Sequence, residues 1–146
     1  MKTLPFAAAA AAVGLALVAG PASAAPTFVT ATGGTAMRLC YFAPNADPAS
    51  ARPSTCRDSH VASQVQTVIH ELNALATGNH GQGTCVRDNN SEVRLVLGYR
   101  DGHRERVDVH FSSCQFAEHA GHISKQSTHP VRQDVARRAG WTGQVP

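Results

Sequence analysis

Apolar residues recur with two different periods along this chain, and each period predicts a different kind of element. Between Asp58 and Ala76 they recur every three or four residues, which predicts one amphipathic helix. The apolar positions of this helix are Val61, Val65, Val68, Ile69, Leu72, Leu75 and Ala76. A side-chain oxygen of Asp58 or Ser59 is expected to cap its start, and Gly78 is expected to end it.

Strict alternation predicts a hairpin further along the chain. Its first strand has Val93, Leu95, Leu97 and Tyr99 on one face, and its second has Val107, Val109 and Phe111. A two-residue turn would pair Leu95 with Asp108 and bury a carboxylate. A three-residue turn with Gly102 in the left-handed conformation pairs Leu95 with Val107, so this register is expected.

The outward face of that hairpin is polar, which is typical of an antiparallel sheet covered by a helix on one side only. Its residues are Arg94, Val96, Arg106, Asp108 and His110. The other predicted elements are a hairpin of Thr27–Ala31 and Ala36–Phe42, a strand or hairpin within Gln115–Ser124 turning near Ala120, a helix over Val131–Ala139 and a frayed tail over Trp141–Pro146. The predicted fold class is therefore α+β, an antiparallel sheet of about five strands with a long helix packed on one face.

The first residues resemble a secretory signal. A lysine at position 2 precedes the apolar run Phe6–Val18, and Ala22-Ser23-Ala24 offers small residues for cleavage after Ala24. The apolar run is too short to span a membrane. We therefore expect a signal peptide over residues 1–24, a domain over 25–124, a C-terminal extension over 125–146, and a secreted protein.

Charge points to no polyanionic partner. The formal net charge of the chain is only +3, and its basic residues are scattered, apart from the adjacent Arg137 and Arg138. Nucleic acid and anionic membrane are therefore not expected as partners.

Four cysteines in a chain with an export signal indicate disulfides. Cys40, Cys56, Cys85 and Cys114 allow three pairings. Sequence order favours Cys40–Cys56 and Cys85–Cys114, because each pair then brackets one compact unit. The C-x2-C spacing of structural zinc sites is missing.

Several of these features together resemble the subtilisin-inhibitor-like family of exported bacterial serine-protease inhibitors. A strand ends in Leu39-Cys40 and is followed by a Pro- and Ala-rich loop to Cys56. The next helix ends in Glu71-Leu72-Asn73-Ala74-Leu75. The chain then continues through Cys85 and a hairpin to Phe111-Ser112-Ser113-Cys114 and Glu118-His119-Ala120-Gly121.

The resemblance covers about Met37 to Ile123 and implies both a fold and a function. It implies a five-stranded antiparallel sheet with helices on one side, first-to-second and third-to-fourth disulfides, and often a homodimer. It also implies a substrate-like reactive loop that begins at the third cysteine. Carried over, that loop comprises Cys85, Val86, Arg87, Asp88 and Asn89, with Arg87 entering the primary specificity pocket of a trypsin-like or subtilisin-like protease.

Two other classes of function compete with inhibition. The eight histidines include His119 and His122, which with His110 are secondary candidates for binding zinc or copper, so the alternative is a non-inhibitory exported binding module. Enzyme chemistry is not expected, because the chain has no nucleophile elbow and its cysteines are expected to be oxidised. No cofactor is expected.

Overall fold

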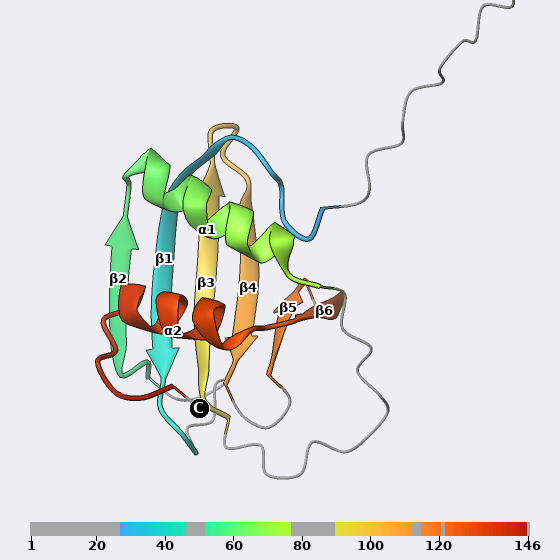
Figure 1. Ribbon diagram of the computed structural model, residues 1–146. Coiled ribbons are helices and arrows are strands. Elements are labelled where there is room, and N and C mark those ends of the chain that lie inside the picture. The colour runs from blue at the N-terminus through green and yellow to red at the C-terminus, as the bar shows by residue number, and fades with distance from the viewer. Residues whose placement is uncertain (1–26, 46–51, 77–89, 112–114, 121, 146) are drawn as a thin grey trace, which may run out of the picture.

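The architecture is a single antiparallel sheet with two helices on one face. A computed structural model describes residues 27–45, 52–76, 90–111, 115–120 and 122–145. The elements that it describes are β1 (Gly34–Phe42), β2 (Thr55–Ser59), α1 (Ala62–Ala74), β3 (Glu92–Tyr99), β4 (Arg104–His110), β5 (Phe116–His119), β6 (His122–Gln126) and α2 (His129–Arg138). The strands lie in the order β2-β1-β3-β4-β5-β6, and Figure 1 shows α1 and α2 on the same side of them. The α+β class is confirmed, with six strands where about five were expected.

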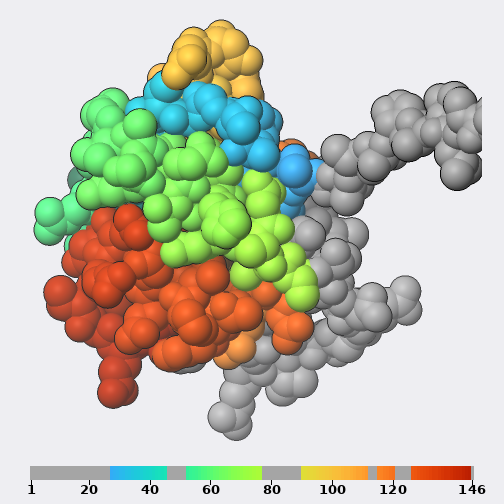
Figure 2. All heavy atoms as spheres, turned by 45° about the horizontal axis from the view of Figure 1, so that its top comes forward, coloured from blue at the N-terminus to red at the C-terminus, as the bar shows by residue number. Residues whose placement is uncertain are grey.

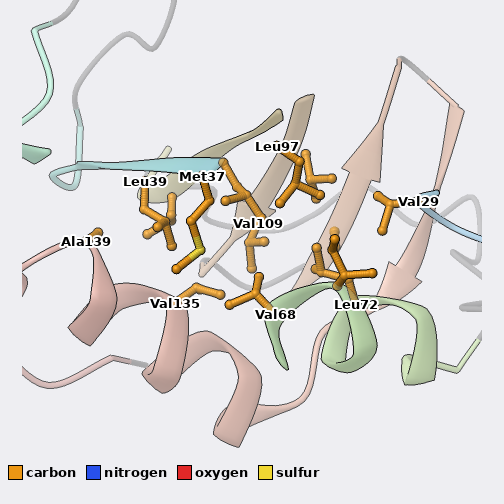
Figure 3. Packing of buried hydrophobic residues seen from close by; sticks show 14 of the residues in the cluster. Val29, Met37, Leu39, Val68, Leu72, Leu97, Val109, Val135 and Ala139 are labelled. Atoms are coloured by element: carbon orange, nitrogen blue, oxygen red, sulfur yellow. The ribbon is translucent and has the colours of Figure 1, made fainter. Parts of the chain in front are cut away.

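The hydrophobic core lies between the sheet and the two helices. Its largest fully buried side chains come from alternate strand positions and from the apolar stripe of α1. Figure 3 shows them pointing toward one another: Val68 and Leu72 of α1, Val135 of α2, and Met37, Leu39, Leu97 and Val109 of the strands. The predicted stripe is thus buried from Val65 to Leu75, whereas its first and last members, Val61 and Ala76, are exposed.

The β3–β4 hairpin has the predicted register. Leu95 pairs with Val107 and Val93 with Val109. The amide of Tyr99 donates to the carbonyl of His103 over 3.1 Å, and Gly102 has a φ of +88°. A three-residue turn with a left-handed glycine is thus confirmed, and it keeps Asp108 out of the core.

The central helix is shorter than predicted. α1 has 13 residues, Ala62–Ala74, and its N-cap is Val61, which provides no side-chain hydrogen bond. Residues 55–59, which include the expected cap residues Asp58 and Ser59, form β2 and pair with β1 instead. Pairing with a neighbouring strand satisfies more backbone groups than a helix cap would, so the prediction of a long helix from Asp58 was wrong. Gly78 lies outside the described residues.

The segment Thr27–Ala31 was wrongly predicted as a strand. It belongs to an irregular segment, residues 27–33, that passes α1 and leads into β1 (Figure 1). We call this segment the N-terminal strap. Side chains satisfy its backbone: Asn73 exchanges two hydrogen bonds with Val29, over 2.9 and 3.1 Å, and Glu105 accepts from the amide of Thr30.

The C-terminal residues are packed rather than frayed. The Trp141 ring stacks on Tyr41 with centroids 4.4 Å apart, and the Val145 side chain is buried. The amide of Trp141 donates to the carbonyl of Ala136 over 2.9 Å. The prediction of a frayed tail was therefore wrong, because an aromatic side chain gives this segment a partner in the core.

The remaining predicted elements are present. β5 and β6 form the expected hairpin, with Ala120 at a φ of +53° in its turn. α2 runs from His129 to Arg138 with Pro130 in its first turn. Backbone N–H groups in the first turn of a helix have no intrahelical acceptor, so a proline there costs no hydrogen bond. Its Val135 and the following Ala139 belong to the core.

One of the two predicted disulfides falls within the described residues. Cys40 and Cys56 are bonded, 16 residues apart in sequence and directly opposite each other in β1 and β2, with their Cα atoms 4.1 Å apart. This confirms the expected pairing of the first and second cysteines. Cys85 and Cys114 lie outside the described residues.

Candidate functional site

The expected reactive loop, Cys85–Asn89, lies outside the described residues, as does Cys114. The structure does describe the chain on either side of both segments. These flanking residues are Ala76 and Asn90 around the first segment, and Phe111 and Gln115 around the second. The geometry of these four positions determines where the two segments begin and end.

Backbone hydrogen bonds tie three of these positions, Ala76, Phe111 and Gln115, to neighbouring segments. The amide of Phe111 donates to the carbonyl of Ser91 over 2.9 Å, which joins the start of β3 to the end of β4. The carbonyl of Ala76 accepts from Gln126 over 3.0 Å, and that of Gln115 accepts from Ser127 over 2.9 Å. Asn90 and Gln115 have positive φ angles of 57° and 32°, so the backbone turns sharply at both places.

A charged cluster lies beside this end of β3 and β4, on the face of the sheet opposite the helices. Its centre is Glu92, whose side chain is only 4% exposed. The guanidinium of Arg94 lies 3.2 Å from Oε1 of Glu92, and the His110 Nδ1 lies 3.5 Å from its Oε2. Arg94 also contacts Asp108 over 3.3 Å, so the cluster links β3 and β4 through side chains as well as backbone.

Glu92 is held in a setting that favours its neutral form. Burial raises the pKa of Glu92, and the neighbouring Asp108 carboxylate raises it further. The positive charges of His110, Arg94 and Arg106 act in the opposite direction without cancelling the rise. The side chain is thus a buried acid whose charge changes at a higher pH than that of an ordinary glutamate.

His110 completes the cluster. Its ring lies against the Phe116 ring of β5, with centroids 4.4 Å apart. Its Nε2 atom is buried and has no hydrogen-bond partner among the described residues. A buried imidazole nitrogen without a partner is costly when protonated or when it carries a hydrogen, so Nδ1 is the nitrogen placed to interact with Glu92.

Replacing Glu92 with glutamine should change how stability depends on pH. A raised pKa means that the contribution of Glu92 to stability is fully present below its unfolded pKa of about 4.3 and is lost as pH rises through the folded value. The wild type should therefore lose stability relative to Glu92→Gln as pH rises above about 4.3. The loss should be about 1.4 kcal/mol for each unit by which the pKa is raised, measured by urea unfolding at each pH.

Asp134 provides a control of opposite sign. Burial raises the pKa of Asp134, but hydrogen bonds from Arg138 and Arg137 outweigh it and lower the pKa overall. The contribution of ionised Asp134 to stability is fully present above its unfolded pKa of about 3.9 and is lost as pH falls through the lower folded value. The advantage of the wild type over Asp134→Asn should therefore shrink as pH falls below about 4. Parallel pH profiles for the wild type and Glu92→Gln would show that Glu92 does not titrate abnormally.

The three histidines suggested as metal ligands do not form one site. His110 follows the core residue Val109 in β4, so its ring lies on the opposite, open face of the sheet. His119 is paired with the core residue Val107, and its ring contacts the buried Phe28 on the helix-covered face. His122 is opposite His119 in register on β6. His110 and His119 therefore point to opposite faces and cannot bind the same ion. Over the described ranges, no three His, Cys, Asp or Glu side chains are placed to hold one metal ion.

The burial of Glu92 could not be predicted from the sequence. The alternation of β3 and β4 places Arg94 and His110 on the outward face, and the same parity places Glu92 there too. What the pattern could not show is that this acid is nearly inaccessible, because burial of an outward-facing residue depends on neighbours from other strands. Phe42, whose ring lies 4.8 Å below the Arg94 guanidinium carbon, is one such neighbour.

Comparison with known proteins identifies no relative: no family model, no curated protein and no solved structure matches this chain. Neither described helix has the length and apolar character needed to cross a membrane.

Proposed function

We propose that this protein is an exported serine-protease inhibitor that acts through a substrate-like loop at Cys85–Asn89, with Arg87 as the specificity residue. The observation that carries the proposal is the hydrogen bond between Phe111 and Ser91. The chain toward Cys85 leaves from one side of this bond and the chain toward Cys114 from the other. Ser91 comes six positions after Cys85, and Cys114 comes three positions after Phe111, so short segments suffice to bring the two cysteines together.

Two further features support the proposal. Cys40 and Cys56 are paired, as the resemblance to subtilisin-inhibitor-like proteins implies for the first two cysteines. Both helices cover one face of an antiparallel sheet (Figure 1), which is the architecture that the resemblance implies. On this basis the proposed second disulfide, Cys85–Cys114, tethers the loop to the rigid end of β4.

Such a loop inhibits because it loses little freedom on binding. A segment already held in its bound shape loses little conformational entropy when it docks in a protease cleft. If the protease cuts the Arg87–Asp88 bond, a disulfide at Cys85 keeps the new ends near each other and the bond can re-form. An arginine suits a specificity pocket that holds a buried carboxylate, because the two charges pair in a site without water.

The proposal is tested by titrating trypsin and subtilisin with the purified, oxidised protein. We expect stoichiometric inhibition of trypsin, and Arg87→Ala should weaken it at least a hundredfold because the pocket loses its charged ligand. The matched control is Arg100→Ala, which removes an exposed arginine from the β3–β4 turn and should leave inhibition unchanged.

Rapid cleavage after Arg87 without inhibition would contradict the proposal. Prolines that brace this loop in subtilisin-inhibitor-like proteins are absent from residues 85–90, so cleavage is the specific way in which the loop can fail. That result would leave the alternative, an exported binding module that retains the architecture without inhibiting a protease.

A further inference from the structure

A second group of interacting polar side chains lies at the opposite end of β3 and β4, around the hairpin turn. Asp101, His103 and Glu105 occur at alternate positions there, and Tyr99 is opposite His103. Figure 2 shows this turn, in gold, next to the N-terminal strap, in blue. Thr30 of the strap contributes both its amide and its hydroxyl to the same group.

The His103 ring is held in one orientation. Its Nδ1 lies 2.5 Å from Oδ1 of Asp101, and its plane stacks on the Tyr99 ring, 4.1 Å away at an angle of 4°. The carboxylate of Asp101 is a hydrogen-bond acceptor, so it orients the Nδ1–H of His103 toward itself. In the neutral imidazole, Nε2 then carries the lone pair.

That lone pair belongs to a nitrogen close to a second carboxylate. The Nε2 atom of His103 lies 3.7 Å from Oε1 of Glu105, which is too far for a hydrogen bond. Two ligands bound to one zinc ion at tetrahedral angles, each about 2.0–2.2 Å from the metal, lie roughly 3.4 Å apart. A shift of a few tenths of an ångström would therefore let both atoms bind the same ion.

Glu105 is also fixed in place. Its carboxylate accepts hydrogen bonds from the Thr30 hydroxyl over 2.7 Å, the Thr30 amide over 3.0 Å and the Tyr99 hydroxyl over 2.6 Å. Histidine ligands oriented by a carboxylate, and carboxylate ligands held by hydrogen bonds, are the outer-shell arrangement that protein metal sites use.

There is room beside His103 for the rest of a coordination shell. A recess of about 200 Å³ is lined by Thr30, Thr32, Gly33, Tyr99, Arg100, Asp101 and His103. Water in this recess can supply further ligands on the His103 side of the pair.

We propose that His103 and Glu105 bind a divalent transition-metal ion such as Zn²⁺, with Asp101, Tyr99 and Thr30 holding the two ligands in position. Imidazole and carboxylate are both ordinary zinc ligands. With two protein ligands, water supplies the remaining positions, and the affinity is moderate. Because Glu105 also holds Thr30, the metal links the hairpin turn to the N-terminal strap.

The test is a titration of the full oxidised protein with Zn²⁺ at pH 7.5, followed by isothermal titration calorimetry. His103→Ala should raise the dissociation constant at least tenfold, and Asp101→Asn should raise it about tenfold through loss of the orienting carboxylate. The control is His60→Ala, which removes an exposed histidine between β2 and α1 and should leave this constant unchanged.

Equal zinc affinity in the wild type and His103→Ala would overturn the proposal, as would the absence of wild-type binding at millimolar zinc. If circular dichroism shows that His103→Ala is misfolded, His103→Gln serves as the second variant, because it keeps a polar side chain beside Asp101 and Tyr99. The readout is independent of protease inhibition, so failure here does not bear on the proposed function.

Discussion

Leu72→Ala should destabilise the protein by about 3–4 kcal/mol, within the range measured for leucine truncation in protein cores. The Leu72 side chain is fully buried, and it projects from α1 into the space between helix and sheet (Figure 3). Truncation removes apolar contacts and leaves a cavity, because packed neighbours relax only in part. Guanidinium unfolding followed by circular dichroism measures the change.

Val61→Ala is the matched control for this experiment. Val61 directly precedes α1 and is 50% exposed, so its truncation should change the free energy of unfolding by less than about 0.5 kcal/mol. A loss below about 1 kcal/mol for Leu72→Ala would mean that the α1 stripe does not pack on the sheet as described.

The elements that could be predicted from the sequence are those whose pattern records burial directly. The β3–β4 register follows from the alternation alone, since a one-residue slip would have put Asp108 opposite Leu95 in the core. The apolar stripe of α1 likewise identifies the helix face that packs on the sheet. In both cases a local pattern is sufficient, because apolar side chains are stable on the buried face of the element and charged ones on the exposed face.

Elements whose partners are distant in sequence were missed. Residues 55–59 carry no apolar alternation, and β2 forms because β1 offers an edge to which the Cys40–Cys56 disulfide holds it. The N-terminal strap contains strand-forming residues, but side chains of Asn73 and Glu105 satisfy its backbone in place of a neighbouring strand. Neither outcome can be read from local propensity, which tertiary contacts override.

The candidate sites likewise divide into those that could be predicted from the sequence and those that depend on tertiary contacts. The pairing of Cys40 with Cys56 was predictable, because sequence order and the family resemblance agreed on it. The His110–His119 combination failed, because neighbours in the sheet point to opposite faces and only the β4–β5 register decides which. The His103–Glu105 pair shows a usable signal: acidic and imidazole side chains at alternate positions beside a tight turn share a face.

Replacing both cysteines of the Cys40–Cys56 disulfide with alanine should lower the free energy of unfolding by about 3 kcal/mol, the value that chain-entropy arguments give for a loop of this length. The bond joins residues 16 apart, so its loss frees the chain between β1 and β2 mainly in the unfolded state. Unfolding by guanidinium under non-reducing conditions measures the difference, and an unchanged midpoint would contradict the expectation.

The same double variant separates stability from inhibition. β2 is an edge strand, and β1 separates it from β3 and β4. The proposed reactive loop leaves from the Ser91–Phe111 hydrogen bond between β3 and β4. While the variant remains folded, its inhibition of trypsin should therefore stay within about twofold of the wild type, since a contact remote from an interface contributes little to binding. Loss of inhibition in a folded variant would instead mean that the β1–β2 edge helps to hold the loop. The structural connection would run through Cys40, which lies directly opposite Arg94 in β3. Arg94 in turn forms an ion pair with Glu92, close to where the proposed loop joins β3.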